Sequence, residues 1–132
     1  LDVEYSEAGR YIPDALLTIN HLLRDFRSGQ VHPIDPALLD VLHALRQQVG
    51  GRAPFEIISA FRSPETNAML AGHSSGVATK SLHLSGRAID IRLPGIATAE
   101  LRDAGMRLRA GGVGYYRESD FIHVDTGRVR YW

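Results

Sequence analysis

The chain has 132 residues, of which 44% are hydrophobic and 23% are charged, and its 15 basic and 15 acidic side chains leave no net charge. This length and composition are typical of one globular domain, and we expect a single domain over residues 1–132. A neutral chain gives no reason to expect nucleic acid as a partner. The absence of cysteine excludes disulfides, thiol nucleophiles and cysteine-ligated zinc. No apolar run reaches membrane-spanning length, so we expect no membrane insertion of this segment.

The N-terminal third of the sequence predicts an arm followed by two helices. Residues 1–11 have no clear periodicity and are expected to form an extended arm. Apolar residues then recur at helical spacing from Pro13 to Phe26, which predicts the first helix. The second helix is expected over residues 36–49, with Asp35 as its N-cap.

The middle of the chain predicts a strand, a short helix and a long loop. Residues 55–60 are rich in β-formers and indicate a strand. Ser63 precedes a proline and is the expected cap of a helix over residues 64–70. Residues 71–82 are rich in Gly, Ser and Thr and indicate a long ordered loop, a feature that is often functional.

Residues 87–93 alternate in the manner of a half-buried strand. Ile89 and Ile91 fall on one face, and Asp90 falls on the other. A helix capped by Thr98 is expected next. Three further short strands are expected over residues 113–116, 121–125 and 129–132. Helices therefore come first and strands last, which predicts an α+β fold with a central, mostly antiparallel sheet and helices packed on one face.

Three separated side chains are candidates for a metal site. If the apolar faces of their strands pack against the helices, Asp90 and His123 emerge together on the opposite face. Gly86 allows the backbone to bend, so that His83 can join them from the preceding loop. Two imidazoles and one carboxylate fit a catalytic zinc ion with an open position for water, and non-haem iron is a weaker alternative with the same ligand types.

Two charged residues are candidates for catalysis beside the metal. Asp120 lies three residues before His123 and is a candidate base, on the expectation that the strand begins after Asp120 and leaves its side chain free to turn inward. Arg62 follows the strand that ends at residue 60. Its guanidinium could stabilise the oxyanion of the substrate carbonyl, or it could equally hold a substrate carboxylate.

Three further residues are expected beside the ligands or the substrate. Asp125 shares a strand face with His123 and could orient an imidazole through a hydrogen bond. Ser81 lies two residues before His83, and His73 lies in the Gly/Ser-rich loop, where a substrate-side role is possible. The remaining histidines lie in predicted helices or a connector, and the structural interpretation is preferred for them.

The sequence resembles the zinc peptidases that cut bacterial peptidoglycan, a superfamily that includes D-alanyl-D-alanine carboxypeptidases, lysostaphin and the hedgehog signalling domain. The pattern His-x-x-Gly-x-Ala-x-Asp, from His83 to Asp90, carries this similarity together with a later His-Val-Asp. The murein endopeptidase K branch is the most similar. Its blocks correspond here to Ser59-Ala-Phe-Arg62-Ser63, Thr66-Asn67, Gly76-Val-Ala78, Ser81-Leu-His83, Gly111-Gly112-Val-Gly114-Tyr-Tyr116, His123-Val-Asp-Thr-Gly127 and Trp132.

The resemblance implies a hedgehog-like or D,D-peptidase-like fold and zinc on His83, Asp90 and His123. It also implies a base at Asp120, an oxyanion-stabilising arginine at Arg62, peptidoglycan peptides as partners and a periplasmic or cell-envelope location. The expected function is therefore a zinc metallopeptidase that hydrolyses amide bonds in stem peptides or their cross-links. Two alternatives remain: a carboxypeptidase or dipeptidase acting on free stem-peptide termini, and a non-catalytic binding module that uses the zinc fold.

Overall fold

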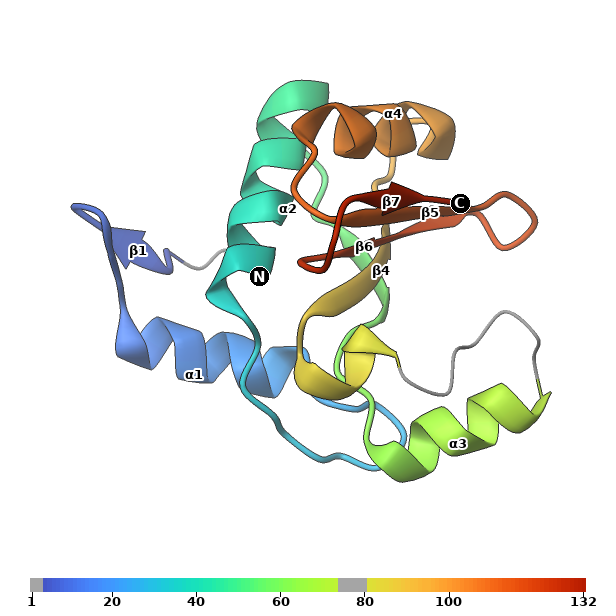
Figure 1. Ribbon diagram of the computed structural model, residues 1–132. Helices are drawn as coiled ribbons and strands as arrows, with labels where there is room; N and C mark the ends of the chain where they lie inside the picture. Colours follow the sequence, from blue (N-terminus) through green and yellow to red (C-terminus); the bar gives the residue numbers. More distant parts are fainter. Residues whose placement is uncertain (1–3, 74–80) are drawn as a thin grey trace.

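A computed structural model of the chain describes residues 4–73 and 81–132, and within these residues four α-helices accompany a five-stranded sheet (Figure 1). The helices are α1 (Pro13–Leu22), α2 (Pro36–Val49), α3 (Pro64–His73) and α4 (Thr98–Leu108), and a short 3-10 helix is η1 (Leu82–Ser85). The sheet strands are β3 (Glu56–Ser59), β4 (Ala88–Arg92), β5 (Gly112–Tyr116), β6 (Phe121–Asp125) and β7 (Arg130–Tyr131). None of these described helices is long and apolar enough to cross a membrane.

The sheet has the strand order β3-β4-β6-β5-β7. Every neighbouring pair is antiparallel except β5 and β7, which run parallel. The predicted α+β class with a mostly antiparallel sheet is therefore confirmed. The order also places β4 and β6 side by side near the middle of the sheet, so residues on these two strands have neighbours on both sides.

One face of the sheet forms the hydrophobic core with the helices. Alternate residues of β4 and β6 point into this core, as predicted from their alternation, and helix residues pack against them. Full burial of each such side chain stabilises the fold by roughly 1.5–3 kcal/mol. The residues of this core cluster that are exposed by at most 1% are Leu38, Leu45, Ala60, Ile89, Ile91, Leu101, Ala104, Ile122 and Val124. The opposite face of the central strands is left for polar side chains.

The helix boundaries follow local signals with three differences. Helix α3 runs to His73, so residues 71–73 are helical, although a loop was expected to begin at residue 71. Asp35 caps α2 as predicted, since its carboxylate accepts a hydrogen bond from the backbone N–H of Ala37 at 3.0 Å. Helix α1 ends at Leu22, short of the predicted Phe26. Helix α4 has Ala97 at its N-cap, so Thr98 is the first helical residue and is not the cap.

The N-terminal arm is a small hairpin docked on α2. Its strands β1 (Ser6–Glu7) and β2 (Arg10–Tyr11) pair antiparallel. The hydroxyls of Tyr5 and Tyr11 donate to the two carboxylate oxygens of Asp40 at 2.7 and 2.8 Å. The arm was expected to be extended, and these bonds to α2 explain why it folds back.

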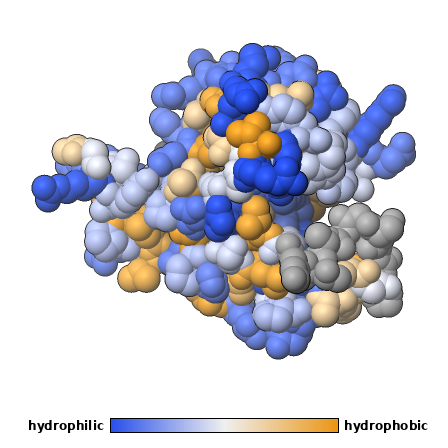
Figure 2. All heavy atoms as spheres, viewed as in Figure 1, coloured by the Kyte–Doolittle hydropathy of each residue, from blue (hydrophilic) through white to orange (hydrophobic). Residues whose placement is uncertain are grey.

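Helix α3 and the apolar surface over α1 lie outside the hydrophobic core. Helix α3 contributes none of its described side chains to the core, and its Asn67 instead contacts Arg62. Apolar side chains reach the surface over α1, in the lower left of Figure 2, where Leu17 is 65% exposed and Leu22 is 41% exposed. The polar cluster described next lies away from that apolar surface, on the opposite face of β4 and β6 from the core.

Candidate metal centre

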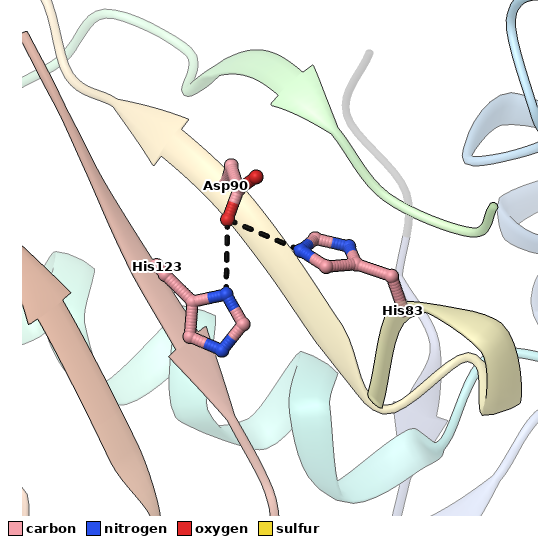
Figure 3. A group of neighbouring side chains, drawn as sticks. All are labelled: His83, Asp90 and His123. Atoms are coloured by element: carbon pink, nitrogen blue, oxygen red, sulfur yellow. Dashed lines mark hydrogen bonds and ion pairs between the residues drawn. The ribbon is translucent and has the colours of Figure 1, made fainter. Parts of the chain in front are cut away.

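Three side chains from distant parts of the sequence meet on the polar face of the sheet (Figure 3). Asp90 on β4 and His123 on β6 are directly opposite each other in the strand register, and His83 comes from η1. Each offers one ligand atom, and these atoms lie within 4.8 Å of one another. Among the described residues, these are the histidine and acidic side chains whose ligand atoms lie close enough together to hold one metal ion. The predicted convergence of residues 83, 90 and 123 is therefore observed.

The cluster is enclosed by protein. His83, Asp90 and His123 are 2%, 4% and 8% exposed. Oδ1 of Asp90 lies 3.2 Å from Nε2 of His83 and 3.0 Å from Nδ1 of His123. A single carboxylate oxygen thus faces one nitrogen of each imidazole, and a divalent cation held here would have all three side chains as ligands.

The backbone around η1 explains how His83 reaches Asp90. The hydroxyl of Ser81 accepts a hydrogen bond from the backbone N–H of His83 at 3.1 Å and caps η1. Gly86 follows in the left-handed conformation, with φ of 68°. A Cβ at this position would collide with the backbone oxygen of Pro33. Gly86 is therefore required both by its φ and by this close approach, and Ser81 supports the ligand through the backbone.

Each histidine is held so that one nitrogen faces the cluster. Nδ1 of His83 lies 2.7 Å from the backbone oxygen of Ala60, which can only accept, so Nδ1 carries the proton. Nε2 of His123 lies 2.7 Å from Oδ2 of Asp125. Once the imidazoles are neutral, lone pairs remain on Nε2 of His83 and Nδ1 of His123. This donor set fits a divalent metal, with outer partners of the type that orient metal-bound histidines.

Asp125 is fixed more firmly than the sequence suggested. It is 1% exposed and accepts backbone N–H bonds from Gly112 and Gly127, each at 2.9 Å. Arg130 donates to both of its oxygens at 3.0 and 2.8 Å. Burial favours the protonated acid most strongly, but the bonds from His123, Arg130 and the two backbone groups outweigh it and hold the pKa of Asp125 below its usual range.

The cluster also shifts the protonation of its own members. Burial acts to raise the pKa of Asp90, but hydrogen bonds from His123 and His83 outweigh burial and hold that pKa below its usual range. Burial acts to lower the pKa of His123, but hydrogen bonds to Asp125 and Asp90 raise it overall. Without a metal, the cluster therefore favours an ionised Asp90 and a protonated His123.

Arg62 lies against Asp90. Its Nη2 donates to Oδ2 of Asp90 at 3.1 Å, its Nε donates to the hydroxyl of Ser59 at 3.0 Å, and its Nη1 lies 3.5 Å from Oδ1 of Asn67. Burial lowers the pKa of Arg62, while Asp90 and then Tyr116 act to raise it. The structure thus brings Arg62 to the cluster, where it holds the Asp90 oxygen that does not face the histidines.

Asp120 is placed differently from the ligands. It lies in the turn before β6, with φ of 56°, and its side chain is 66% exposed. Its carboxylate accepts a hydrogen bond from the hydroxyl of Thr98, at the start of α4, and lies 4.0 Å from Nη1 of Arg92. The turn was expected to aim Asp120 inward, but the structure does not bring this carboxylate to the cluster. The role of Asp120 as a base stays a prediction, and it would require the side chain to leave Thr98.

Of the remaining predicted residues, the side chain of His73 lies outside the described residues. The sequence analysis missed the Ala60 carbonyl, and it gave no structural role to Gly112 and Gly114. A Cβ on Gly112 would collide with Arg130 and lie 2.7 Å from Oδ2 of Asp125. The glycines on this face of β5 therefore make room for groups around the metal centre, and their alternation within a strand was the available signal.

Comparison with known proteins gives a consistent family. The sequence matches, over residues 1–132, the family described as Peptidoglycan L,D-endopeptidase MepK. It is 43% identical over 132 residues to the Peptidoglycan L,D-endopeptidase MepK of Escherichia coli (strain K12), which covers 100% of this chain and 72% of the relative. It is 44% identical over 133 residues to the Probable peptidoglycan L,D-endopeptidase MepK of Haemophilus influenzae, with the same coverage.

One solved structure, that of Serratia marcescens L-Ala D-Glu endopeptidase ChiX, is a weaker match. Its TM-score is 0.44 at 22% identity, over 58% of this chain and 62% of that one. The family assignment rests instead on the full-length family match and on the two relatives above. The predicted resemblance to the murein endopeptidase K branch is confirmed. The chain belongs to the Peptidoglycan L,D-endopeptidase MepK family.

Proposed function

We propose that this chain is a zinc-dependent peptidase that hydrolyses an amide bond in peptidoglycan peptides, with the metal on His83, Asp90 and His123. The family and its relatives are named for L,D-endopeptidase activity on peptidoglycan. We therefore take an L,D bond within a stem peptide or cross-link as the substrate bond. The enzyme would act in the cell envelope, where this polymer lies.

The single observation that carries the proposal is the arrangement of the two imidazoles. Each points one nitrogen toward Oδ1 of Asp90 and engages the other with an acceptor outside the cluster. A histidine that only stabilised the core would not need to point a nitrogen toward the same oxygen as a second histidine. Nor would it need a tautomer that leaves a lone pair on that nitrogen. A zinc ion there would supply Lewis acidity toward a peptide carbonyl and toward water.

The protein contributes a rigid and partly dry setting for this chemistry. The register of β4 and β6 fixes Asp90 opposite His123, and the Ala60 carbonyl fixes the ring of His83. Arg62 holds the second oxygen of Asp90, so the carboxylate keeps one orientation. Three N–H groups of Arg62 are used by contacts with described residues. Because a guanidinium has five, we propose that the same side chain also stabilises negative charge on the substrate carbonyl.

The decisive experiment is digestion of purified sacculi followed by mass spectrometry of the released muropeptides. Zinc-loaded protein is expected to release peptide fragments, and a chelator is expected to abolish release until zinc is returned. His123→Ala is expected to lose both bound zinc and activity. His21→Ala, which changes an exposed histidine in α1, is the matched control and should keep both.

The products also separate the proposal from its alternatives. Conversion of cross-linked dimers to monomers, or cleavage within a stem, indicates an endopeptidase. Removal of a single terminal residue indicates a carboxypeptidase. One bound zinc per chain with no product from sacculi indicates a binding module, and that result would overturn the proposed activity.

A further inference from the structure

Trp132 is a half-exposed aromatic residue fixed beside the metal centre. The indole is 49% exposed, and its ring centroid lies 5.1 Å from that of His123. A tryptophan left half exposed on a surface leaves apolar area in contact with water. Its position next to a ligand therefore calls for an explanation beyond packing.

Several contacts hold this indole in one place. Its Nε1 donates to the hydroxyl of Tyr116 at 3.0 Å, and the guanidinium carbon of Arg130 lies 5.0 Å from the indole centroid. The backbone N–H of Trp132 donates to the oxygen of Val113 at 3.1 Å, and its oxygen accepts from Tyr115 at 2.8 Å. The residue is thus anchored through both its backbone and its ring.

The sheet leaves a space that fits the indole. Gly114 on β5 pairs with His123 in the strand register. A Cβ on Gly114 would lie 2.5, 2.6 and 2.7 Å from three atoms of the Trp132 ring. The indole therefore lies directly over the Gly114 backbone, on the same face of the sheet as the metal ligands.

The strand order places this indole across the centre from Arg62. Arg62 follows β3 at one edge of the sheet, Asp90 and His123 lie on the adjacent strands β4 and β6, and Trp132 follows β7 at the other edge. Arg62 contacts Asp90 and Trp132 contacts His123. The metal centre consequently has a cationic side toward β3 and an aromatic side toward β5 and β7.

We propose that Trp132, held by Tyr116, forms an aromatic contact surface for the substrate and packs against the peptide on the side of the metal centre opposite Arg62. This inference rests on the proposed function. The chemistry of an indole surface favours the uncharged parts of a stem peptide, its backbone and short aliphatic side chains, which can lie flat on the ring. Trp132 would then act as a positioning residue that orders the peptide beside the metal.

The first test is kinetic. With muropeptide dimers as substrate, Trp132→Ala is expected to raise KM on the order of tenfold with a smaller change in kcat, because apolar contact with bound substrate is lost. Trp132→Phe keeps a ring and is expected to fall between Trp132→Ala and the unchanged protein. Tyr131→Leu is the matched control, since Tyr131 is exposed and its hydroxyl bonds to Met106 on α4, away from the site.

Two further measurements separate a substrate contact surface from a structural support. Zinc content by elemental analysis should stay at one ion per chain in Trp132→Ala, and loss of zinc would overturn the proposal because the indole would then only support His123. Trp132 is the single tryptophan of the chain, so tryptophan fluorescence reports on the surroundings of this residue alone. Muropeptide monomers added to the zinc-loaded protein are expected to shift that emission saturably.

The outcomes are distinguishable from failure of the proposed function. If the unchanged protein releases nothing from sacculi, the proposed activity fails. If that protein is active and Trp132→Ala has the same KM and kcat, or if emission stays constant while calorimetry detects peptide binding, only the role of Trp132 fails.

Discussion

Nε2 of His123 donates a hydrogen bond of 2.7 Å to Oδ2 of Asp125, two residues further along β6. Residues two apart in a strand share a face, so the spacing itself brings the two side chains together. The bond turns Nδ1 of His123 toward Asp90, which lies 3.0 Å away. A buried carboxylate outside the candidate metal cluster thus decides which nitrogen of His123 faces Asp90.

We predict that Asp125→Asn weakens metal binding by about 10–100-fold, because the amide no longer enforces the tautomer and orientation of His123. Isothermal titration of the metal-free protein with zinc measures this change. Asp103→Asn, at an exposed residue of α4 paired with Arg102, is the control and should bind zinc as the unchanged protein does. Equal affinity in the two variants would show that Asp125 does not orient the ligand.

Metal binding is expected to weaken on acidification and to release protons. Hydrogen bonds to Asp125 and Asp90 raise the pKa of His123 above its ordinary value of about 6.5 despite its burial. Below that raised pKa, zinc must displace a proton from Nδ1, so apparent affinity falls by about tenfold per pH unit for each proton displaced. Titrations at several pH values, repeated in buffers of different ionisation enthalpy, measure the affinity and the proton count.

The raised pKa of His123 has the opposite effect on the stability of the metal-free protein: acidification weakens zinc binding but stabilises the metal-free fold. A raised folded-state pKa makes His123 stabilising below about pH 6.5, and this stability is lost as pH rises through the raised value. Zinc binding stabilises most at higher pH, where its affinity is greater. Thermal melts with and without zinc should therefore diverge as pH rises, and a constant gap would contradict the coupling.

Asp120→Ala is expected to keep its zinc, because the Asp120 carboxylate bonds to Thr98 and not to the cluster. It is expected to lose hydrolysis by more than about a hundredfold, because Asp120 is the predicted base. The loss of that bond at the start of α4 should reduce the free energy of unfolding by about 1 kcal/mol. Digestion of sacculi measures the hydrolysis, elemental analysis measures the zinc content, and urea denaturation measures the free energy of unfolding. Full activity with zinc intact would remove Asp120 from the mechanism.

Asp25→Ala is expected to destabilise the fold by roughly 2–4 kcal/mol, because it leaves one buried and two part-buried backbone N–H groups without their acceptor. Asp25 is 2% exposed and accepts from the backbone N–H of Arg27, Ser28 and Ser63 at 2.8, 3.1 and 2.8 Å. The bond to Ser63 ties the segment after α1 to the residue next to Arg62. Urea denaturation measures the loss, and Asp103→Ala, exposed on α4, should change stability by less than about 0.5 kcal/mol.

Asp25 also predicts an acid limit to stability. Burial acts to raise the pKa of Asp25, but its hydrogen bonds outweigh burial and hold that pKa below its usual range. Its contribution is therefore present above the ordinary value of about 3.9 and is lost as pH falls below it. Acid titration of the unfolding free energy should show a shallower decline in Asp25→Ala than in the unchanged protein.

The sequence by itself determined the alternation that separates core from site. Ile89 and Ile122 fall on one strand face, and Asp90 and His123 fall on the other, because successive side chains in a strand point to opposite sides. The spacing of Gly86 between His83 and Asp90 marked the backbone bend in the same way. These are local properties, and local periodicity is what a sequence pattern records.

Only the tertiary structure decided which groups surround the ligands. The Ala60 carbonyl on His83, the pairing of Arg62 with Asp90 and the indole over Gly114 join residues whose contact depends on strand order, not on spacing. Asp120 shows the same limit, since a turn residue with φ of 56° has no periodicity from which its side-chain direction can be inferred. The order β3-β4-β6-β5-β7 follows from how the helices and strands pack together, and that packing brings an arginine near the start of the sheet and a tryptophan at its end to opposite sides of one centre.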